Sequence, residues 1–142
     1  MKMDELLSRN LIRRETPNAE EIDGTMVTAR HFLDRAKGNM GVDFYDTAFL
    51  LAYTAMFHEA KALLLKAGYK ERSHYSLIAA LKELYANDAS LEAHLNTLDS
   101  YRTTGHAIQY SGDLSSERDA SQAIRDCESF INAAGAELGK RY

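Results

Sequence analysis

The chain has 142 residues, of which 45% are hydrophobic and only one is proline, and its formal net charge is −4. This length suits one globular domain with a sizeable core, and the negative charge excludes a protein coated for non-specific nucleic-acid binding, although it leaves room for a small basic site. The single cysteine, Cys127, excludes an internal disulfide and fits the reducing environment of the cytoplasm.

The first 17 residues are expected to form a loosely attached arm or a short helix. They contain no apolar run long enough for a signal peptide or a membrane span. Their apolar side chains are sufficient for a short helix: Leu6, Leu7, Leu11 and Ile12. The pair Arg13-Arg14 and then Pro17 are expected to break that helix. We find no convincing strand and no internal repeat anywhere in the chain.

Residues 18–142 are predicted to form one helical bundle domain, whose first helix runs from Asn18 to about Lys37. Apolar residues recur there at a 4-3-4-3 spacing, which is typical of one face of a helix. These residues are Ile22, Met26, Ala29, Leu33 and Ala36. The GNMG run at 38–41 predicts a tight connection to the next helix.

The stretch 43–68 is predicted to be the central helix of the bundle. It is rich in Ala, Leu and Met, which favour helices, and it has no proline and no internal glycine. Its apolar residues occupy most of the circumference, so other elements must cover it on most sides. Asp43 is expected to cap its start, and Gly68 is expected to end it in a left-handed conformation.

Three further helices are predicted in the second half of the chain. A short one covers 74–86 behind Ser73, which suits an N-cap, the next runs from about Ala89 to about Gln109, and the last follows Ser116. The apolar stripe of the 89–109 helix is Leu91, Leu95, Leu98, Arg102 and Gly105, and that of the last helix is Ala120, Ile124, Cys127, Ile131, Ala134 and Leu138. Because short connections join long amphipathic helices, we predict an all-α, up-and-down antiparallel bundle of four to six helices.

Arg102 is the most informative residue in these stripes, because its charge continues an apolar face. We expect it to be at least partly buried against an anionic group, either a carboxylate such as Asp99 or Glu59 or the phosphate of a ligand. His106 and Tyr110 follow four and eight residues later, so a continuous helix places them near the same face. Arginine offers a bidentate fork for phosphate, histidine exchanges protons near neutral pH, and tyrosine can stack on a base. A purely structural role, with Arg102 paired to a carboxylate and His106 solvated, stays open.

The remaining histidines divide into one site candidate and three structural residues. His74 begins a helix, where backbone donors disfavour its protonated form, so we expect a neutral imidazole that serves either a site or the preceding loop. His58 is more typical of a core or interface position, and His31 and His94 are expected at the surface. Glu71 and His74 form half of a carboxylate-bundle metal motif, but the second half is absent, so we expect no metal site and no cofactor.

Three separated stretches together resemble HEPN domains. YTAMFHEAKALLLKAGYKERSH at 53–74 resembles the second long helix and following turn of that family, and LDSYRTTGHAIQY at 98–110 resembles its arginine-containing helix. The small-residue stripe of the last helix resembles the family's last helix, so the resemblance covers 19–139. It implies a helical bundle that dimerises, often with the arginine helix at the two-fold axis. Many such proteins are metal-independent ribonucleases, others bind nucleotides or RNA, and many pair with a minimal nucleotidyltransferase as a toxin–antitoxin couple.

This resemblance places Arg102 and His106 at the catalytic positions of the family, with a spacer of three residues that is shorter than the usual one. The departure favours a dimeric module in a toxin–antitoxin pair that binds a nucleotide, RNA or a nucleotidyltransferase partner. The alternative is a metal-independent ribonuclease, in which His106 takes the proton of a 2′-hydroxyl and Arg102 neutralises the phosphate. Thr103, His74 and Tyr110 are the expected substrate-binding residues. No DNA-binding motif and no membrane partner are expected.

Overall fold

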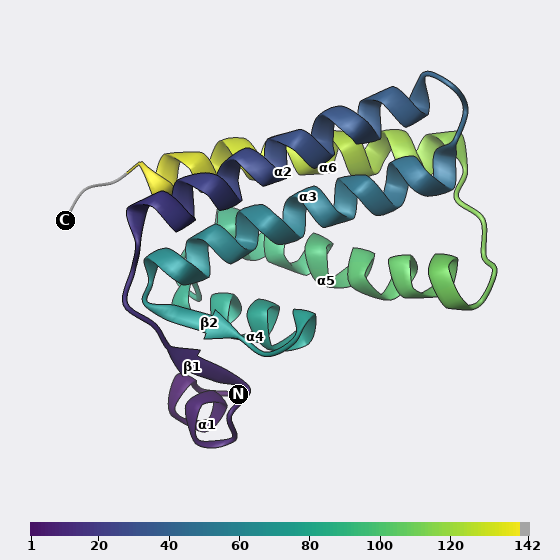
Figure 1. Cartoon of the computed structure of the whole chain (residues 1–142). Coiled ribbons are helices and arrows are strands. Elements are labelled where there is room, and N and C mark those ends of the chain that lie inside the picture. Colours follow the sequence, from purple (N-terminus) through teal and green to yellow (C-terminus); the bar gives the residue numbers. More distant parts are fainter. Residues whose placement is uncertain (140–142) are drawn as a thin grey trace.

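The computed structural model describes residues 1–139, and helix α3 (Tyr45–Lys66) runs through the centre of the molecule (Figure 1). More than half of its 22 residues are buried, and four other helices pack against it. By length and composition this helix could cross a membrane, but 67% of its most apolar window is buried inside the molecule. Its apolar circumference is therefore explained by its place in the core of the bundle.

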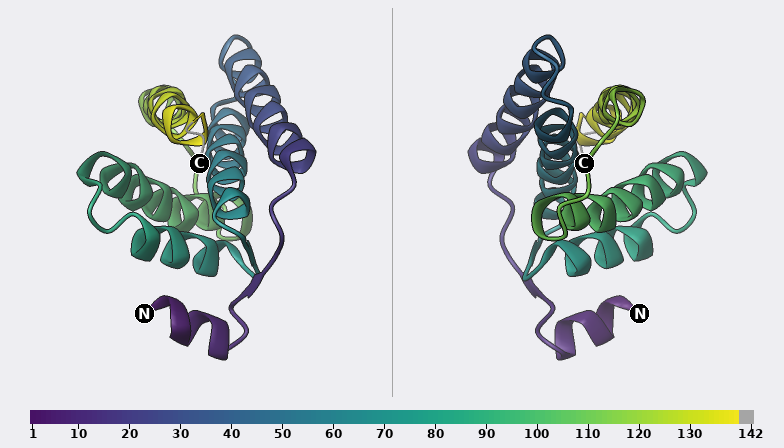
Figure 2. Two further views of the ribbon diagram at one scale, coloured as in Figure 1. Left: turned by 90° about the vertical axis from the view of Figure 1, so that its left-hand side faces the viewer. Right: turned by 90° about the vertical axis from the view of Figure 1, so that its right-hand side faces the viewer.

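The other helices form two layers around α3. These helices are α1 (Met3–Ser8), α2 (Ala19–Met40), α4 (His74–Leu84), α5 (Ala89–Tyr110) and α6 (Glu117–Leu138). Helices α2 and α6 cover one side of α3, whereas α4 and α5 cover the other side (Figure 2). The pairs α2/α3 and α5/α6 run antiparallel (Figure 1). The predicted all-α bundle is thus confirmed.

Side-chain caps fix three of the predicted helix starts. The side chain of Asn18 accepts from the backbone N–H of Glu21, and that of Ser116 accepts from Asp119. Ser73 forms a reciprocal capping box with Ser76 at the start of α4. Each cap satisfies an amide that the first helical turn would otherwise leave without a partner.

The two ends predicted for the central helix have different outcomes. Gly68 follows the helix with φ +94°, the left-handed conformation that glycine adopts without strain, so the predicted C-terminal stop is confirmed. Asp43 does not cap the start: it lies in the preceding turn with φ +64°, and its carboxylate instead accepts a hydrogen bond from Tyr45. The cap position falls on Phe44, which has no side-chain acceptor, because α2 extends to Met40 and shifts the turn along the chain.

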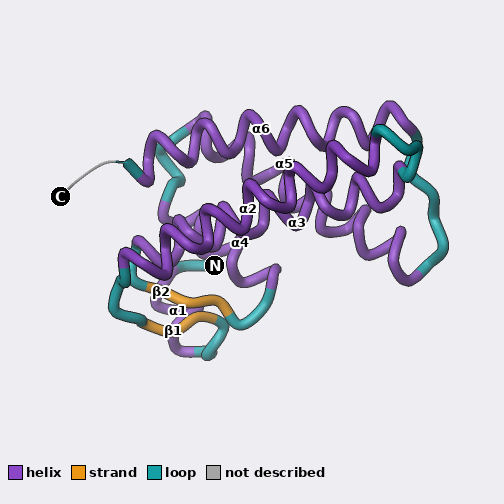
Figure 3. The backbone as a smooth tube through the Cα atoms, turned by 45° about the horizontal axis from the view of Figure 1, so that its top comes forward, coloured by secondary structure: helices purple, strands orange, loops and turns teal. Residues whose placement is uncertain are grey.

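The expectation that the chain has no strand is wrong. Strands β1 (Ile12–Arg14) and β2 (Tyr69–Glu71) form an antiparallel pair (Figure 3), in which Arg13 lies opposite Lys70. The N-terminal arm, which contains α1 and β1, packs against the bundle, because Leu6 and Ile12 are buried in the same core as the long helices. The arm is therefore packed and hydrogen-bonded and is not a loosely attached segment.

Candidate functional site

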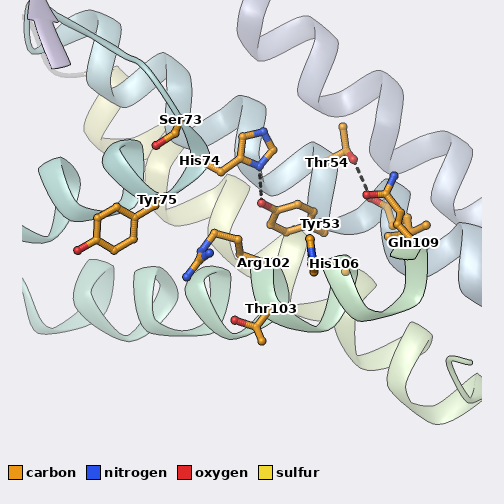
Figure 4. Close-up of a pocket in the computed structure, with 11 residues that line it drawn as sticks. Tyr53, Thr54, Ser73, His74, Tyr75, Arg102, Thr103, His106 and Gln109 are labelled. Atoms are coloured by element: carbon orange, nitrogen blue, oxygen red, sulfur yellow. Dashed lines mark hydrogen bonds between the residues drawn. The ribbon is translucent and has the colours of Figure 1, made fainter. Parts of the chain in front are cut away.

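A cavity of about 600 Å³ lies between the middle of α3, the start of α4 and the second half of α5 (Figure 4). It is lined by Leu50, Tyr53, Thr54, Ser73, His74, Tyr75, Arg102, Thr103, Gly105, His106 and Gln109. Four of the five predicted site residues are in this set, although they come from two different helices. The cavity therefore brings together side chains that lie far apart in the sequence.

Arg102 is half-buried and paired with a carboxylate, as the stripe of α5 predicts. Its Nε lies 3.1 Å from Oδ1 of Asp99, and the Nζ of Lys82 lies 3.5 Å from the other oxygen of the same carboxylate. Asp99, and not Glu59, is thus the partner. One carboxylate is shared by two cations, so this cluster keeps a net positive charge.

The geometry of the guanidinium leaves part of it available to a ligand. Within residues 1–139, the Nε of Arg102 is the only one of its nitrogens that makes a hydrogen bond. The guanidinium carbon lies 5.8 Å from the ring centroid of Tyr75, and Figure 4 shows this group extending into the space between α4 and α5. The two terminal nitrogens, which form a bidentate fork for carboxylate or phosphate, are therefore free to bind an anion from the cavity.

His74 is held by Tyr53, a residue that the sequence analysis did not single out. The hydroxyl of Tyr53 lies 2.6 Å from Nδ1 of His74, and the ring of Phe57 stacks on the imidazole with centroids 3.8 Å apart. Burial raises the pKa of Tyr53 to about 12, so the phenol keeps its proton and can serve as the donor to Nδ1. Burial, and then the charge of Arg102, lower the pKa of His74. The expected neutral imidazole is thus supported, but burial is the principal cause.

The three other predicted residues lie at the open side of the site. Thr103 and His106 are exposed at the cavity wall. Tyr110 is 73% exposed and does not line the cavity, but its ring centroid lies 4.8 Å from that of His106. His106 and His74 are thus both accessible from solvent, but the imidazole of His74 is held by Tyr53 and Phe57, whereas His106 contacts only the ring of Tyr110 among the described aromatic residues.

The remaining histidines serve packing or face solvent. His58 stacks on Phe32 with ring centroids 5.3 Å apart, as expected for a core position. His31 is exposed as predicted, but His94 is half-buried against Phe130 and is not a surface residue. Its ring is covered because α5 and α6 pack together. Across residues 1–139, no three His, Cys, Asp or Glu side chains gather closely enough to hold a metal ion.

A second unusual group is buried in the core, away from the cavity. Glu59 on α3 is fully buried, and neither carboxylate oxygen has a hydrogen-bond partner within the described part of the chain. Burial raises its pKa to about 7, while the charge of Arg30 opposes this shift. Burial, followed by the charge of Glu59, raises the pKa of Cys127 to about 12. Cys127 is therefore an inert core thiol, as the α6 stripe predicts.

Comparison with known proteins gives two matches to this chain. Residues 25–138 match the family described as HEPN domain. A protein of Methanocaldococcus jannaschii named "Putative toxin MJ0605" is 30% identical over 115 residues, which cover 80% of this chain and 85% of that protein. The family match begins inside α2 and ends at the last residue of α6, so it contains every residue of the cavity and excludes α1 and β1.

Proposed function

Because the chain belongs to the HEPN domain family, we propose that it is a toxin-like module that binds the phosphate group of RNA or of a nucleotide in the cavity between α3, α4 and α5. The free terminal nitrogens of Arg102 carry this proposal. They belong to a half-buried cation whose only carboxylate partner within residues 1–139, Asp99, is shared with Lys82. A monoanionic phosphodiester at this point would balance the single positive charge that the cluster keeps.

The cavity also offers groups that suit the rest of a nucleotide. Tyr75 is half-exposed beside the guanidinium and can stack on a base, as aromatic side chains do in RNA-binding proteins. The hydroxyl of Thr103 and the amide of Gln109 line the opposite wall and can donate to sugar or base oxygens. A nucleotide would thus be bound through its phosphate at Arg102, with polar side chains around its sugar and base.

Titration with a fluorescent adenine nucleotide and with a short single-stranded RNA tests this function. We expect Arg102→Ala to weaken both affinities by at least about tenfold, because one charge-assisted bidentate contact is worth more than about 1.4 kcal/mol. Arg35→Ala removes an exposed cation on α2 and serves as the matched control. Equal affinities of the two variants would overturn the assignment of the cavity.

Cleavage of RNA is the alternative activity, and the presence of two imidazoles in one cavity favours it. His106 is exposed and can accept the proton of a 2′-hydroxyl, while Arg102 would stabilise the charge that develops on the phosphate. His74 would then act as a hydrogen-bond donor through Nε2, in the tautomer in which Nδ1 accepts from Tyr53. In this reaction His106 takes the 2′-hydroxyl proton, the 2′-oxygen attacks phosphorus, the bond to the 5′-oxygen breaks, and the leaving oxygen takes a proton from water.

We further propose that the protein is a homodimer in the cytoplasm and acts with a nucleotidyltransferase partner. The support is family membership, together with the exposed rings of Tyr75 and Tyr110 along the face that carries the cavity. Sedimentation of a 15.9 kDa species at micromolar concentration would contradict the dimer. Co-purification with a minimal nucleotidyltransferase encoded by the adjacent gene tests the partner.

A further inference from the structure

The two-stranded sheet places three cations on one of its faces. Arg13 and Lys70 are direct partners in the antiparallel register, so their side chains point to the same side. Arg72 lies two residues beyond Lys70, and its N–H continues the ladder by donating to Leu11, so it points to that side as well. Ile12 points to the opposite side, where it is buried. We name Arg13, Lys70 and Arg72 the basic face of the sheet.

This arrangement costs stability unless an anion offsets it. Like charges directly opposite each other in an antiparallel pair repel, and Arg13 and Lys70 occupy such a pair. Within residues 1–139 the only ion pair of these cations joins the exposed Arg13 to the less exposed Glu15, at a long 3.7 Å, so it offsets little of this repulsion. In the described part of the chain, neither Lys70 nor Arg72 has a carboxylate within ion-pair distance.

The basic face is hollowed and not flat. All three of its cations line a cavity of about 400 Å³, which Asn10, Ile12 and Glu71 complete. Glu71 contributes the single acidic side chain of this lining, so the cations outnumber it three to one. In a chain with net charge −4, such a local excess of positive charge indicates an anionic partner.

The chain leads from this face directly into the cavity described above. Arg72 is followed by Ser73 and His74, both of which line the Arg102 cavity. Figure 3 shows β2 running into the turn before α4, and Figure 4 shows that turn entering the site. The two cavities share no lining residue, so a ligand with several phosphates in series is better suited than a single nucleotide to contact both Arg102 and the basic face.

We propose that the basic face binds the backbone phosphates of a single-stranded RNA that has another phosphate at Arg102. The proposal rests on the phosphate-binding function of the Arg102 cavity and names its ligand as a polynucleotide. Lys70 and Arg72 lie inside the family match at residues 25–138, whereas Arg13 lies outside it, so the N-terminal arm contributes one of the three cations of this face. Backbone contacts of this kind add affinity without reading sequence.

Fluorescence anisotropy with two probes tests the proposal: a labelled single-stranded RNA of about 12 nucleotides, long enough for two sites, and a labelled mononucleotide. The variant combines Arg13→Ala, Lys70→Ala and Arg72→Ala, which keeps every backbone hydrogen bond of the sheet. We expect its RNA affinity to fall by at least about tenfold and the slope of log K against log salt to decrease by about 2, near 0.7 for each lost phosphate contact. Its mononucleotide affinity should match that of the unchanged protein.

The matched control combines Arg35→Ala, Arg118→Ala and Arg125→Ala, three exposed cations on α2 and α6. Unchanged RNA affinity and salt slope in the basic-face variant, with weakened binding in Arg102→Ala, would overturn this inference and leave the Arg102 site intact. The proposed function would be overturned if Arg102→Ala, like the basic-face variant, kept full mononucleotide affinity. It would also be overturned if the unchanged protein bound no RNA. Tighter binding of a labelled polyglutamate peptide than of RNA would assign the face to an acidic protein and refute the RNA assignment.

Lys70→Ala alone keeps the proposal testable if the triple variant does not fold. It removes one member of the repelling pair, so a melting temperature at least equal to that of the unchanged protein is expected. A salt slope reduced by about 0.7 would support one phosphate contact at this position. An unchanged slope in this folded variant would count against the proposal.

Discussion

The hydroxyl of Tyr53 and Nδ1 of His74 share a hydrogen bond of 2.6 Å, and this contact occupies one of the two ring nitrogens. Only Nε2 of His74 is left for a ligand, and it donates in the tautomer in which Nδ1 accepts from the phenol. A general base is therefore better placed at His106, which has no side-chain hydrogen-bond partner within residues 1–139. The two histidines of the cavity thus have different chemical capacities despite their shared location.

Tyr53→Phe is expected to release His74 from this arrangement. The variant removes one part-buried hydrogen bond and leaves Nδ1 without its donor, so we expect a loss of about 1 kcal/mol in the free energy of unfolding. Nitrogen NMR of the imidazole should show a changed ratio of the two tautomers, because the phenol no longer contacts Nδ1. Tyr45→Phe, which removes a tyrosine hydrogen bond to Asp43 at the end of the bundle, is the control and should leave the His74 spectrum unchanged.

Arg102→Ala is expected to affect binding far more than stability. The Arg102–Asp99 pair is about a third exposed, and Asp99 keeps Lys82 at 3.5 Å after the substitution. The carboxylate is therefore not left buried and unpaired, and the destabilisation should stay below about 1 kcal/mol. Thermal melts measure it directly. A loss on the order of 3–5 kcal/mol would instead identify Arg102 as a structural residue.

Local signals in the sequence were sufficient for the helices and for Arg102. The caps at Asn18, Ser73 and Ser116 act within one turn, so the residue type and the following apolar stripe define each start. Arg102 was found because it interrupts the apolar spacing of its own helix. These features depend on neighbours three or four positions away, which periodicity can detect.

Contacts between distant elements could not be predicted in the same way. The strands have only three residues each, too few for an alternating pattern, and they pair only because the N-terminal arm returns beside the turn after α3. Tyr53 lies on the buried face of α3, where it is indistinguishable from a packing residue. A buried tyrosine hydroxyl needs a partner, which signals a contact, but the identity of His74 depends on how α4 packs on α3.

His106→Ala tests whether the protein cleaves RNA. If His106 is the general base, the cleavage rate should fall by roughly 10²–10⁴-fold, and the remaining activity should no longer respond to pH near neutrality. Addition of EDTA should leave the rate of the unchanged protein intact, because the proposed reaction uses Arg102 and an imidazole. Activity retained in His106→Ala would reassign the base, whereas activity lost on chelation would refute the metal-independent mechanism.

Glu59 should make the fold less stable as the pH rises. Burial raises its pKa from 4.5 to about 7 in the folded protein, so between these values the folded state holds a proton that the unfolded state has released. Stability is therefore highest below about pH 4.5 with respect to this group, falls as the pH rises toward about 7, and is constant above it. The difference corresponds to about 3 kcal/mol at most.

Glu59→Gln should remove this pH dependence, because the amide of glutamine does not ionise. Chemical denaturation at pH 5 and pH 8 is expected to show similar stability for the variant and the unchanged protein at the lower pH, and a more stable variant at the higher pH. Glu128→Gln, at an exposed ion pair with Lys37, is the matched control and should keep the slope of the unchanged protein. A variant less stable than the unchanged protein at pH 8 would show that Glu59 ionises there at no cost, through a partner such as the nearby Arg30.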